Sequence, residues 1–430
     1  MSGKSTPFLS TEAFWRSLQT AIWWALCLFA LIDTVNGVFV RSGLGMVRPS
    51  QVLKTGVLVA MWCWTLRYAP RRALWSLGVL VVLLQVGFWQ TVAFGGSNWA
   101  GTLPVLLKAV LPVVAFVYVR TVLDRADGAE TGRWLDRVVF INLVVLLANT
   151  VLGFVGIGFK QYHGDVGGTG FLYAGNEVSG MLLLLSAIGL HRLYAQRPAW
   201  YLPAALLLLA VGVLKATKVS MLGIALTAVV VPLAHELPRL RRPRPALVRS
   251  LAGIAGIAVV AVLVLPSVFE SAGYADRWRY WWVAHDGNVI SFLLSARDTY
   301  LARAVDLIRV EGTWVHGLVG WGVNGYTEAF ARFETRTHWP EMDLVDVFLV
   351  FGSVGWVVLW AVHAGALLVG VRRALSDPSP ARLVMVWTAF LVLGVGAIAG
   401  HILMSGLCGI FLGLVLALAT HPHGIKSSQP

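Results

Sequence analysis

Charged residues are scarce in this chain of 430 residues: Asp, Glu, Lys and Arg together make up 13% of it, against 57% hydrophobic residues. Soluble domains carry roughly 25% charged residues, so the composition excludes a soluble globular protein. Strict alternation of apolar and polar residues is missing too, which excludes an outer-membrane barrel. The apolar residues come instead in runs of about 18 to 22, the length of a helix that crosses a bilayer.

Acidic residues and cysteines are also few. The 21 acids face 34 basic residues, and the net charge is +13. Because the basic residues lie in short stretches between apolar runs, they indicate topology and not a nucleic-acid partner. Cys27, Cys63 and Cys408 all fall inside apolar runs, which predicts small buried side chains and no disulfide framework. No metal-ligand spacing is visible, so we expect no metal and no cofactor.

The sequence predicts an all-α polytopic membrane protein with about twelve transmembrane helices and one long periplasmic loop that contains short helices. Many of the 19 Trp residues lie near the ends of apolar runs, as in interfacial aromatic belts. The expected spans are 17–37, 51–67, 73–94, 103–121, 136–157, 174–191, 199–214, 219–236, 248–266, 343–371, 383–401 and 403–420.

The bias of Lys and Arg among the short loops predicts that both chain ends are cytoplasmic. The expected organisation is nine transmembrane helices in residues 1–266, a periplasmic loop domain in 267–342, and three helices with a cytoplasmic tail in 343–430. A short helix is expected at 294–309, where apolar residues recur at helical spacing. The predicted location is the bacterial inner membrane.

Polar residues near the outer ends of the spans require an explanation. Lys215 and Lys218 lie between the seventh and eighth spans, against the topology bias. Ionisable residues at membrane depth are costly and often functional, although a lysine can also extend its ammonium to the headgroups. Asn176 and Glu177 open the sixth span, where they could equally cap the helix.

The long loop combines basic and aromatic residues. Its arginines include Arg277, Arg279 and Arg297, and aromatic residues cluster at 274–282. Mixed charges of this kind are usually a solvated surface. Guanidinium groups nevertheless suit diphosphate oxygens, and flat aromatic faces suit sugars. At the end of the loop, His338, Glu341, Asp343 and Asp346 gather where the chain re-enters the membrane; an ordinary helix start explains Glu341 and Asp343 well and Asp346 poorly.

Several of these segments match family motifs in order and spacing. They are Gly170 to Asn176, Ala216 to Lys218, Leu294 to Arg297, Gly320 to Tyr326, and Glu341 to Gly355. Over residues 165–365 the chain therefore resembles the O-antigen ligase and O-antigen polymerase superfamily of membrane glycosyltransferases, and more closely its exopolysaccharide-polymerase branch. Lys218 replaces the usual arginine, and Glu341 stands where the family has a histidine, with His338 three residues upstream.

The resemblance implies transfer of an oligosaccharide from an undecaprenyl diphosphate carrier to an acceptor glycan at the periplasmic face. Lys218 and Arg297 would neutralise the leaving diphosphate, and His338 or Glu341 would be the base. The expected substrate-binding residues are Lys215, Arg277, Arg279, Asn176 and Asp343. Membrane lipids, a flippase and a chain-length regulator are further expected partners.

Other functions remain open at this point. A ligase would deliver the glycan to lipid A-core instead of another lipid-linked repeat unit. A transporter of polysaccharide or lipid-linked sugar would concentrate its polar residues at mid-membrane depth on broken helices. A purely structural role would leave Lys218 and Asp346 unexplained.

Overall fold

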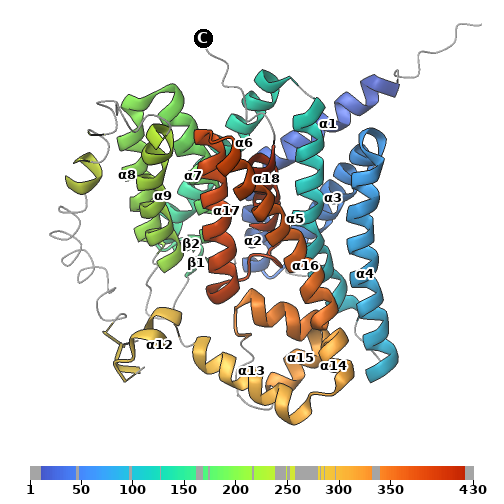
Figure 1. The fold of residues 1–430 in the computed structure, drawn as a ribbon. Coiled ribbons are helices and arrows are strands. Elements are labelled where there is room, and N and C mark those ends of the chain that lie inside the picture. Colours follow the sequence, from blue (N-terminus) through green and yellow to red (C-terminus); the bar gives the residue numbers. More distant parts are fainter. Residues whose placement is uncertain are drawn as a thin grey trace, which may run out of the picture.

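The computed structural model describes residues 11–44, 48–95, 99–125, 127–160, 168–172, 175–215, 217–237, 248, 252–256, 279–280, 282–284, 286–295, 297–331 and 339–421. These residues form a helical bundle with a group of short helices at one end (Figure 1). Seven helices are long and apolar enough to cross a membrane: α4 (Pro70–Phe94), α5 (Trp99–Arg125), α6 (Gly128–Phe154), α7 (Gly175–Gln196), α9 (Lys218–Glu236), α16 (Asp343–Ser376) and α17 (Pro380–Ala399).

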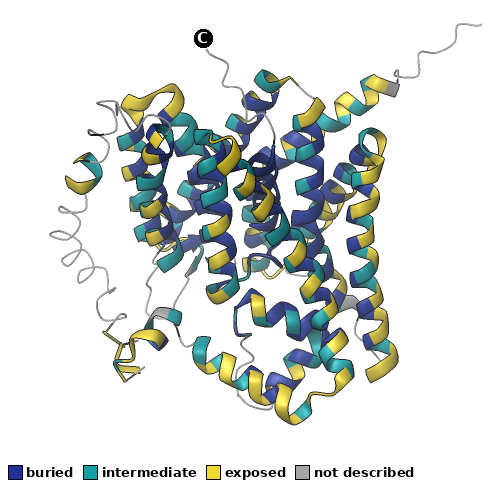
Figure 2. Ribbon diagram, viewed as in Figure 1, coloured by how far each residue is buried: buried dark blue, intermediate teal, exposed yellow. Residues whose placement is uncertain are grey.

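An eighth span is counted if the bent pair α1 (Thr11–Cys27) and α2 (Phe29–Arg41) crosses as one unit. Three further expected spans coincide with helices that are too short or less apolar, namely α3 (Pro49–Tyr68), α8 (Tyr201–Leu214) and α18 (Gly409–Thr420). The expected span at 248–266 lies almost wholly outside the described residues. Large apolar side chains such as Phe88, Trp89 and Phe140 are exposed. Exposed residues recur along the outer helices, as on α4 (Figure 2). The protein is thus an all-α, multi-pass membrane protein.

The 58° bend between α1 and α2 has an identifiable cause. At the break, Asn142 of α6 accepts a hydrogen bond from the Ala30 amide and donates one to the Leu26 carbonyl, both at 2.8 Å. A side chain that satisfies backbone groups in this way allows a helix to bend inside a membrane. Asn142 is fully buried, so its role is structural.

Helix α16 is kinked at Gly352, whose φ of 65° lies in the left-handed region. The end of α14 (Trp314–Val319) packs against this kink, and a Cβ at position 352 would stand 2.2 Å from the Leu318 carbonyl oxygen. Only glycine tolerates both the backbone angle and the close approach. The Trp321 amide donates to the Leu349 carbonyl at 2.8 Å, which secures the same junction.

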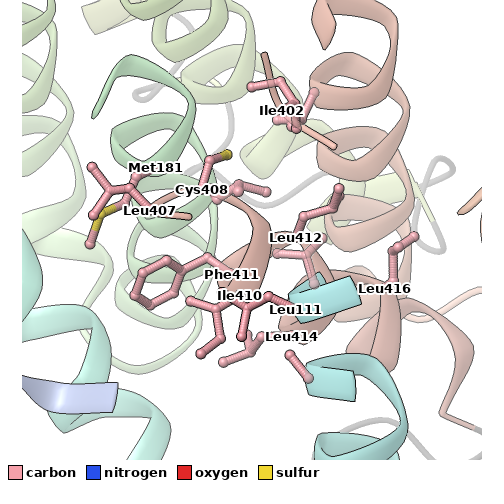
Figure 3. Close-up of a cluster of buried hydrophobic side chains, with 14 of the residues drawn as sticks. Leu111, Met181, Ile402, Leu407, Cys408, Ile410, Phe411, Leu412, Leu414 and Leu416 are labelled. Atoms are coloured by element: carbon pink, nitrogen blue, oxygen red, sulfur yellow. The ribbon is translucent and has the colours of Figure 1, made fainter. Parts of the chain in front are cut away.

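Helix α18 forms the centre of the bundle and is buried along its whole length. It packs against α5, α16, α17 and α7, within the apolar cluster drawn in Figure 3. Gly409 and Gly413 are four residues apart and face Pro112 of α5, and a Cβ on Gly413 would lie 2.4 Å from the Pro112 carbonyl oxygen. Small residues at this spacing let membrane helices approach closely.

The expected spans 383–401 and 403–420 are only partly right, because α17 ends at Ala399 and α18 begins at Gly409. Residues 400–408, here the polar loop, have no helical structure, and all of them except His401 are buried. Irregular backbone is tolerated at membrane depth where protein groups satisfy it. Acidic side chains from α7 and α16 do so here, as the next section describes.

The short helices α12 (Val289–Leu294), α13 (Arg297–Glu311), α14 and α15 (Gly322–Ala331) lie together at one end of the bundle and are here named the helical cap (Figure 1). The expected short helix at 294–309 corresponds to α13, which begins at Arg297 because Ser295 adopts a left-handed conformation after the end of α12. A small antiparallel pair, β1 (Phe159–Lys160) and β2 (Gly168–Gly170), packs beside α6. A 3-10 turn, η1 (Pro198–Trp200), precedes α8.

Candidate functional site

Three segments distant in sequence meet at Glu341, just before α16. The Arg297 Nη2 atom lies 2.7 Å from the Glu341 Oε2 atom, and its Nε donates to the Glu341 carbonyl at 3.3 Å. Asn176, in the first turn of α7, donates to the same Oε2 atom at 2.9 Å. The Glu341 side chain is 40% exposed, and Oε1 has no partner among the described residues. This Arg297–Glu341–Asn176 contact links the helical cap to the bundle.

Lys218, the first residue of α9, attaches to the same part of the cap. Its ammonium donates to the Phe292 carbonyl and, at 3.1 Å, to the Ser295 hydroxyl. It also lies 4.6 Å from the centre of the Phe292 ring, a cation–π distance. The segment that Lys218 holds leads directly into Arg297, so the two cations are fixed by one stretch of chain.

The backbone is strained at both contacts. Ser295 and Glu341 have φ values of 55° and 54°, which side-chain-bearing residues rarely adopt. The only other such residue in the described part of the chain is Asp286. Each such angle costs on the order of 1–2 kcal/mol and persists when surrounding contacts enforce it. The contacts of Lys218 and Arg297 supply that enforcement.

Asp343 was expected to bind substrate, but its carboxylate is fully buried. Its Oδ2 atom accepts hydrogen bonds from the Ile402 and Leu403 amides at 2.8 and 2.9 Å. Charged acceptors form the stronger class of such bonds. Asp343 therefore positions the polar loop and presents no exposed oxygen to a ligand.

Two other acids hold the polar loop. Glu177, next to Asn176, accepts from the Ser405 hydroxyl and, at 3.3 Å, from the Leu407 amide. Asp346 is fully buried, lies 3.3 Å from the His401 Nδ1 atom, and accepts from the Tyr326 hydroxyl at 3.2 Å. The acids that hold the polar loop thus come from two of the three segments that meet at Glu341, 176–177 and 341–346.

Lys215 is almost completely buried, with 1% of its surface exposed. Its ammonium has no hydrogen-bond partner in the part of the chain that the structure describes. Burial lowers the pKa of this lysine from its ordinary 10.5 to about 7. An unpaired lysine in such surroundings stabilises nothing, which makes it a candidate for function.

Replacing Lys215 should therefore stabilise the protein. Because the folded-state pKa lies below the unfolded one, the unfolded state binds the extra proton between pH 7 and 10.5. The cost of Lys215 is largest at or below pH 7 and disappears as the pH rises towards 10.5. We expect Lys215→Met to raise the melting temperature by roughly 5 °C near neutral pH, and less in alkali. Melting curves that coincide with the wild type at all pH values would contradict this.

The other expected site residues divide into two groups. His338 and Arg277 lie outside the described residues. Arg279 is exposed ahead of α12. Across the described ranges, no group of three His, Cys, Asp or Glu side chains is arranged to hold a metal ion.

The sequence alone did not indicate the part played by Glu177, Tyr326, His401 and Ser405. The available signal was the interruption of an apolar run by polar and small residues at His401, Ser405 and Gly406. A hydropathy average over the whole run hides such an interruption.

An apolar groove with a volume of about 710 Å³ runs along the side of the bundle between α6, α7 and α8. Its lining reaches Leu182 and Val211, which are six residues beyond Asn176 and four before Lys215. At the other end lie Arg197 and the ion pair of Arg192 with Asp136. The groove therefore starts about two helical turns from the Asn176 contact and leads away from it.

Comparison with known proteins adds no relative: no family model matches the chain, and no curated protein matches it.

Proposed function

We propose that this chain is a membrane glycosyltransferase that polymerises undecaprenyl-diphosphate-linked oligosaccharide repeat units at the periplasmic face of the bacterial inner membrane. The product would be an exopolysaccharide or O-antigen. The proposal includes about twelve transmembrane helices and a periplasmic position for the helical cap. It rests on the resemblance in sequence and on the geometry around Glu341.

The observation that carries the proposal is the Arg297–Glu341–Asn176 contact beside Lys218. It brings together two cations, a partly exposed carboxylate and a carboxamide from four segments. The strained backbone at Ser295 and Glu341 supports a functional reading, because such angles gather at active sites. Cations held in place before the reaction stabilise a leaving diphosphate without reorganisation.

In the proposed reaction, an acceptor sugar hydroxyl attacks the anomeric carbon of the carrier-bound oligosaccharide. The new glycosidic bond forms as the bond to the diphosphate oxygen breaks, and the lipid diphosphate leaves with that electron pair. Arg297 and Lys218 would bind the diphosphate oxygens. The hydroxyl proton passes to His338 or to the Glu341 carboxylate, whose Oε1 atom has no partner in the described structure.

The apolar groove between α6, α7 and α8 supports a lipid-linked donor. A long prenyl tail needs an apolar path open to the bilayer, and this groove begins near the Asn176 and Lys215 segments. We assign the prenyl tail to this groove. The diphosphate would bind Arg297 and Lys218, beyond the end of the groove that lies near Asn176.

The direct test is to reconstitute the purified protein with a lipid-linked repeat unit and to follow chain length by gel electrophoresis. Lengthened chains that stay attached to the lipid diphosphate identify a polymerase. Transfer to lipid A-core without lengthening identifies a ligase. Movement of the lipid-linked sugar across the bilayer without a new glycosidic bond would identify a transporter and refute the proposal.

Lys218 offers a sharper prediction. Lys218→Arg should retain about a tenth or more of the activity, since it keeps the charge that contacts Ser295. Lys218→Met should lose about a hundredfold, the usual result of removing one electrostatic contact to a leaving group. Initial rates of chain growth measure both, at equal protein levels. Equal rates for the two variants would show that the charge does not matter.

A further inference from the structure

A pocket that contains two lysines lies on another side of the bundle, between α3 and α5. Its volume is about 380 Å³, and apolar residues of both helices, including Leu58, Leu103 and Leu111, line it. Lys54 of α3, Lys108 of α5 and Gly406 of the polar loop also face it. None of these residues takes part in the reaction proposed above.

The two lysines converge on one point of the polar loop. A Cβ built on Gly406 would lie 3.4 Å from the Lys108 Cε atom and 3.6 Å from the Lys54 Nζ atom. Lys108 is nine residues from the start of α5, which is about 13 Å along a helix. Its aliphatic stem rests on the loop, and the side chain lines the pocket.

The charges of the pocket do not balance. Lys54 is neutralised by Asp33, whose two carboxylate oxygens both lie 2.8 Å from its ammonium. Lys108 has neither a hydrogen bond nor an ion pair within the described residues. One positive charge therefore remains uncompensated among leucine side chains, and a charge at membrane depth is costly without a counter-ion.

The depth of the pocket matches a lipid headgroup. The start of α5 reaches the helical cap, where Gly101 lies against the Asn324 side chain of α15. Lys108 is seven residues beyond Gly101, about 10 Å further along the helix. A headgroup phosphate of the leaflet on the cap side would lie at this level, and acyl chains would lie against Leu107 and Leu111.

We propose that this pocket binds one anionic phospholipid of the phosphatidylglycerol type, whose phosphodiester pairs with Lys108 and whose acyl chains lie between α3 and α5. A phosphodiester carries a single negative charge, which equals the uncompensated charge of the pocket. A lipid diphosphate-sugar carries two and would leave one unpaired. The bound phosphate lies beside Gly406 of the polar loop.

The test uses the full chain, purified in detergent and stripped of lipid. Dioleoylphosphatidylglycerol is titrated in, bound lipid is counted by native mass spectrometry, and melting temperature is followed in parallel. The wild type should retain one phosphatidylglycerol and melt at a higher temperature with it. Dioleoylphosphatidylcholine, which has no net charge, should do neither.

Variants locate the binding. Lys108→Gln should weaken phosphatidylglycerol binding about tenfold, as loss of a charge-assisted contact does. Arg71→Gln removes an exposed charge at the start of α4, outside the pocket, and should bind as the wild type does. Thr55→Trp fills the pocket but leaves both lysines, so it tests the site even if Lys108→Gln does not fold; Leu66→Trp, further along α3, is its control.

Three results would overturn the proposal. The first is wild-type affinity in folded Lys108→Gln or Thr55→Trp. The second is equal binding of the two phospholipids. The third is displacement of phosphatidylglycerol by undecaprenyl diphosphate at lower concentration, with dependence on Lys108, which would make this a diphosphate pocket. Because none of these measurements involves sugar transfer, their failure is separate from failure of the proposed reaction.

Discussion

Arg297→Ala should reduce chain growth by about a thousandfold in a protein that still folds. Arg297 is the residue whose guanidinium reaches both the Glu341 side chain and its carbonyl, and only 12% of its side-chain surface is exposed. In the proposed reaction the Arg297 guanidinium releases the Glu341 carboxylate and binds diphosphate oxygens instead. Arg297→Lys keeps the positive charge but loses the two-pronged guanidinium geometry. Its rate of chain growth should lie between those of the wild type and Arg297→Ala.

The measurement is the initial rate of chain growth against donor concentration in reconstituted vesicles. Loss of transition-state contact lowers kcat, whereas loss of donor binding alone raises KM. Arg309→Ala, an exposed arginine in the last turn of the same helix, is the matched control and should leave both unchanged. A wild-type rate for folded Arg297→Ala would remove Arg297 from the site.

A double variant separates two roles of Arg297. If Arg297 acts only by holding Glu341, then Arg297→Ala in a Glu341→Ala background should cost nothing further. If it contacts the donor, the second substitution should still lower the rate substantially. We expect the second result, because Lys218 and Arg297 flank the same segment and both could reach one anion.

Much of the helical layout could be predicted from the sequence, because apolar runs of membrane length must become helices. Arg297, Glu341 and Asn176, which the sequence motifs indicate as site residues, are in contact in the folded chain. The order and spacing of motifs carried that information, since neither composition nor periodicity indicates which loop residue meets which helix end.

Breaks in the helices could not be predicted, because their causes lie far away in the sequence. The bend after Cys27 depends on Asn142 of α6. The polar loop depends on Glu177 and Asp343, and a hydropathy profile treats Ile402–Cys408 as one more apolar segment. The sequence alone does not distinguish a carboxylate that accepts hydrogen bonds from buried amides from one that binds a substrate.

Asp343→Ala should release the polar loop and lower the melting temperature sharply. The carboxylate is fully buried and accepts two amide hydrogens. Leaving two buried amides without an acceptor costs about 2–6 kcal/mol. Asp343→Asn keeps a carbonyl oxygen at the same place and should lose much less. Thermal unfolding of the purified protein measures both.

The accessibility of the Cys408 thiol provides a local probe of whether the polar loop is released. Its thiol is fully buried at the end of the polar loop, whereas the Cys63 thiol is exposed and is removed to avoid a background signal. In a Cys63→Ser background, Asp343→Ala should make Cys408 react with a maleimide at temperatures where the wild type does not. Asp306→Ala, an exposed acid on α13, is the control. If Asp343→Ala keeps Cys408 protected and melts normally yet loses sugar transfer, Asp343 serves the substrate after all, and the loop is held by Glu177 and Asp346 alone.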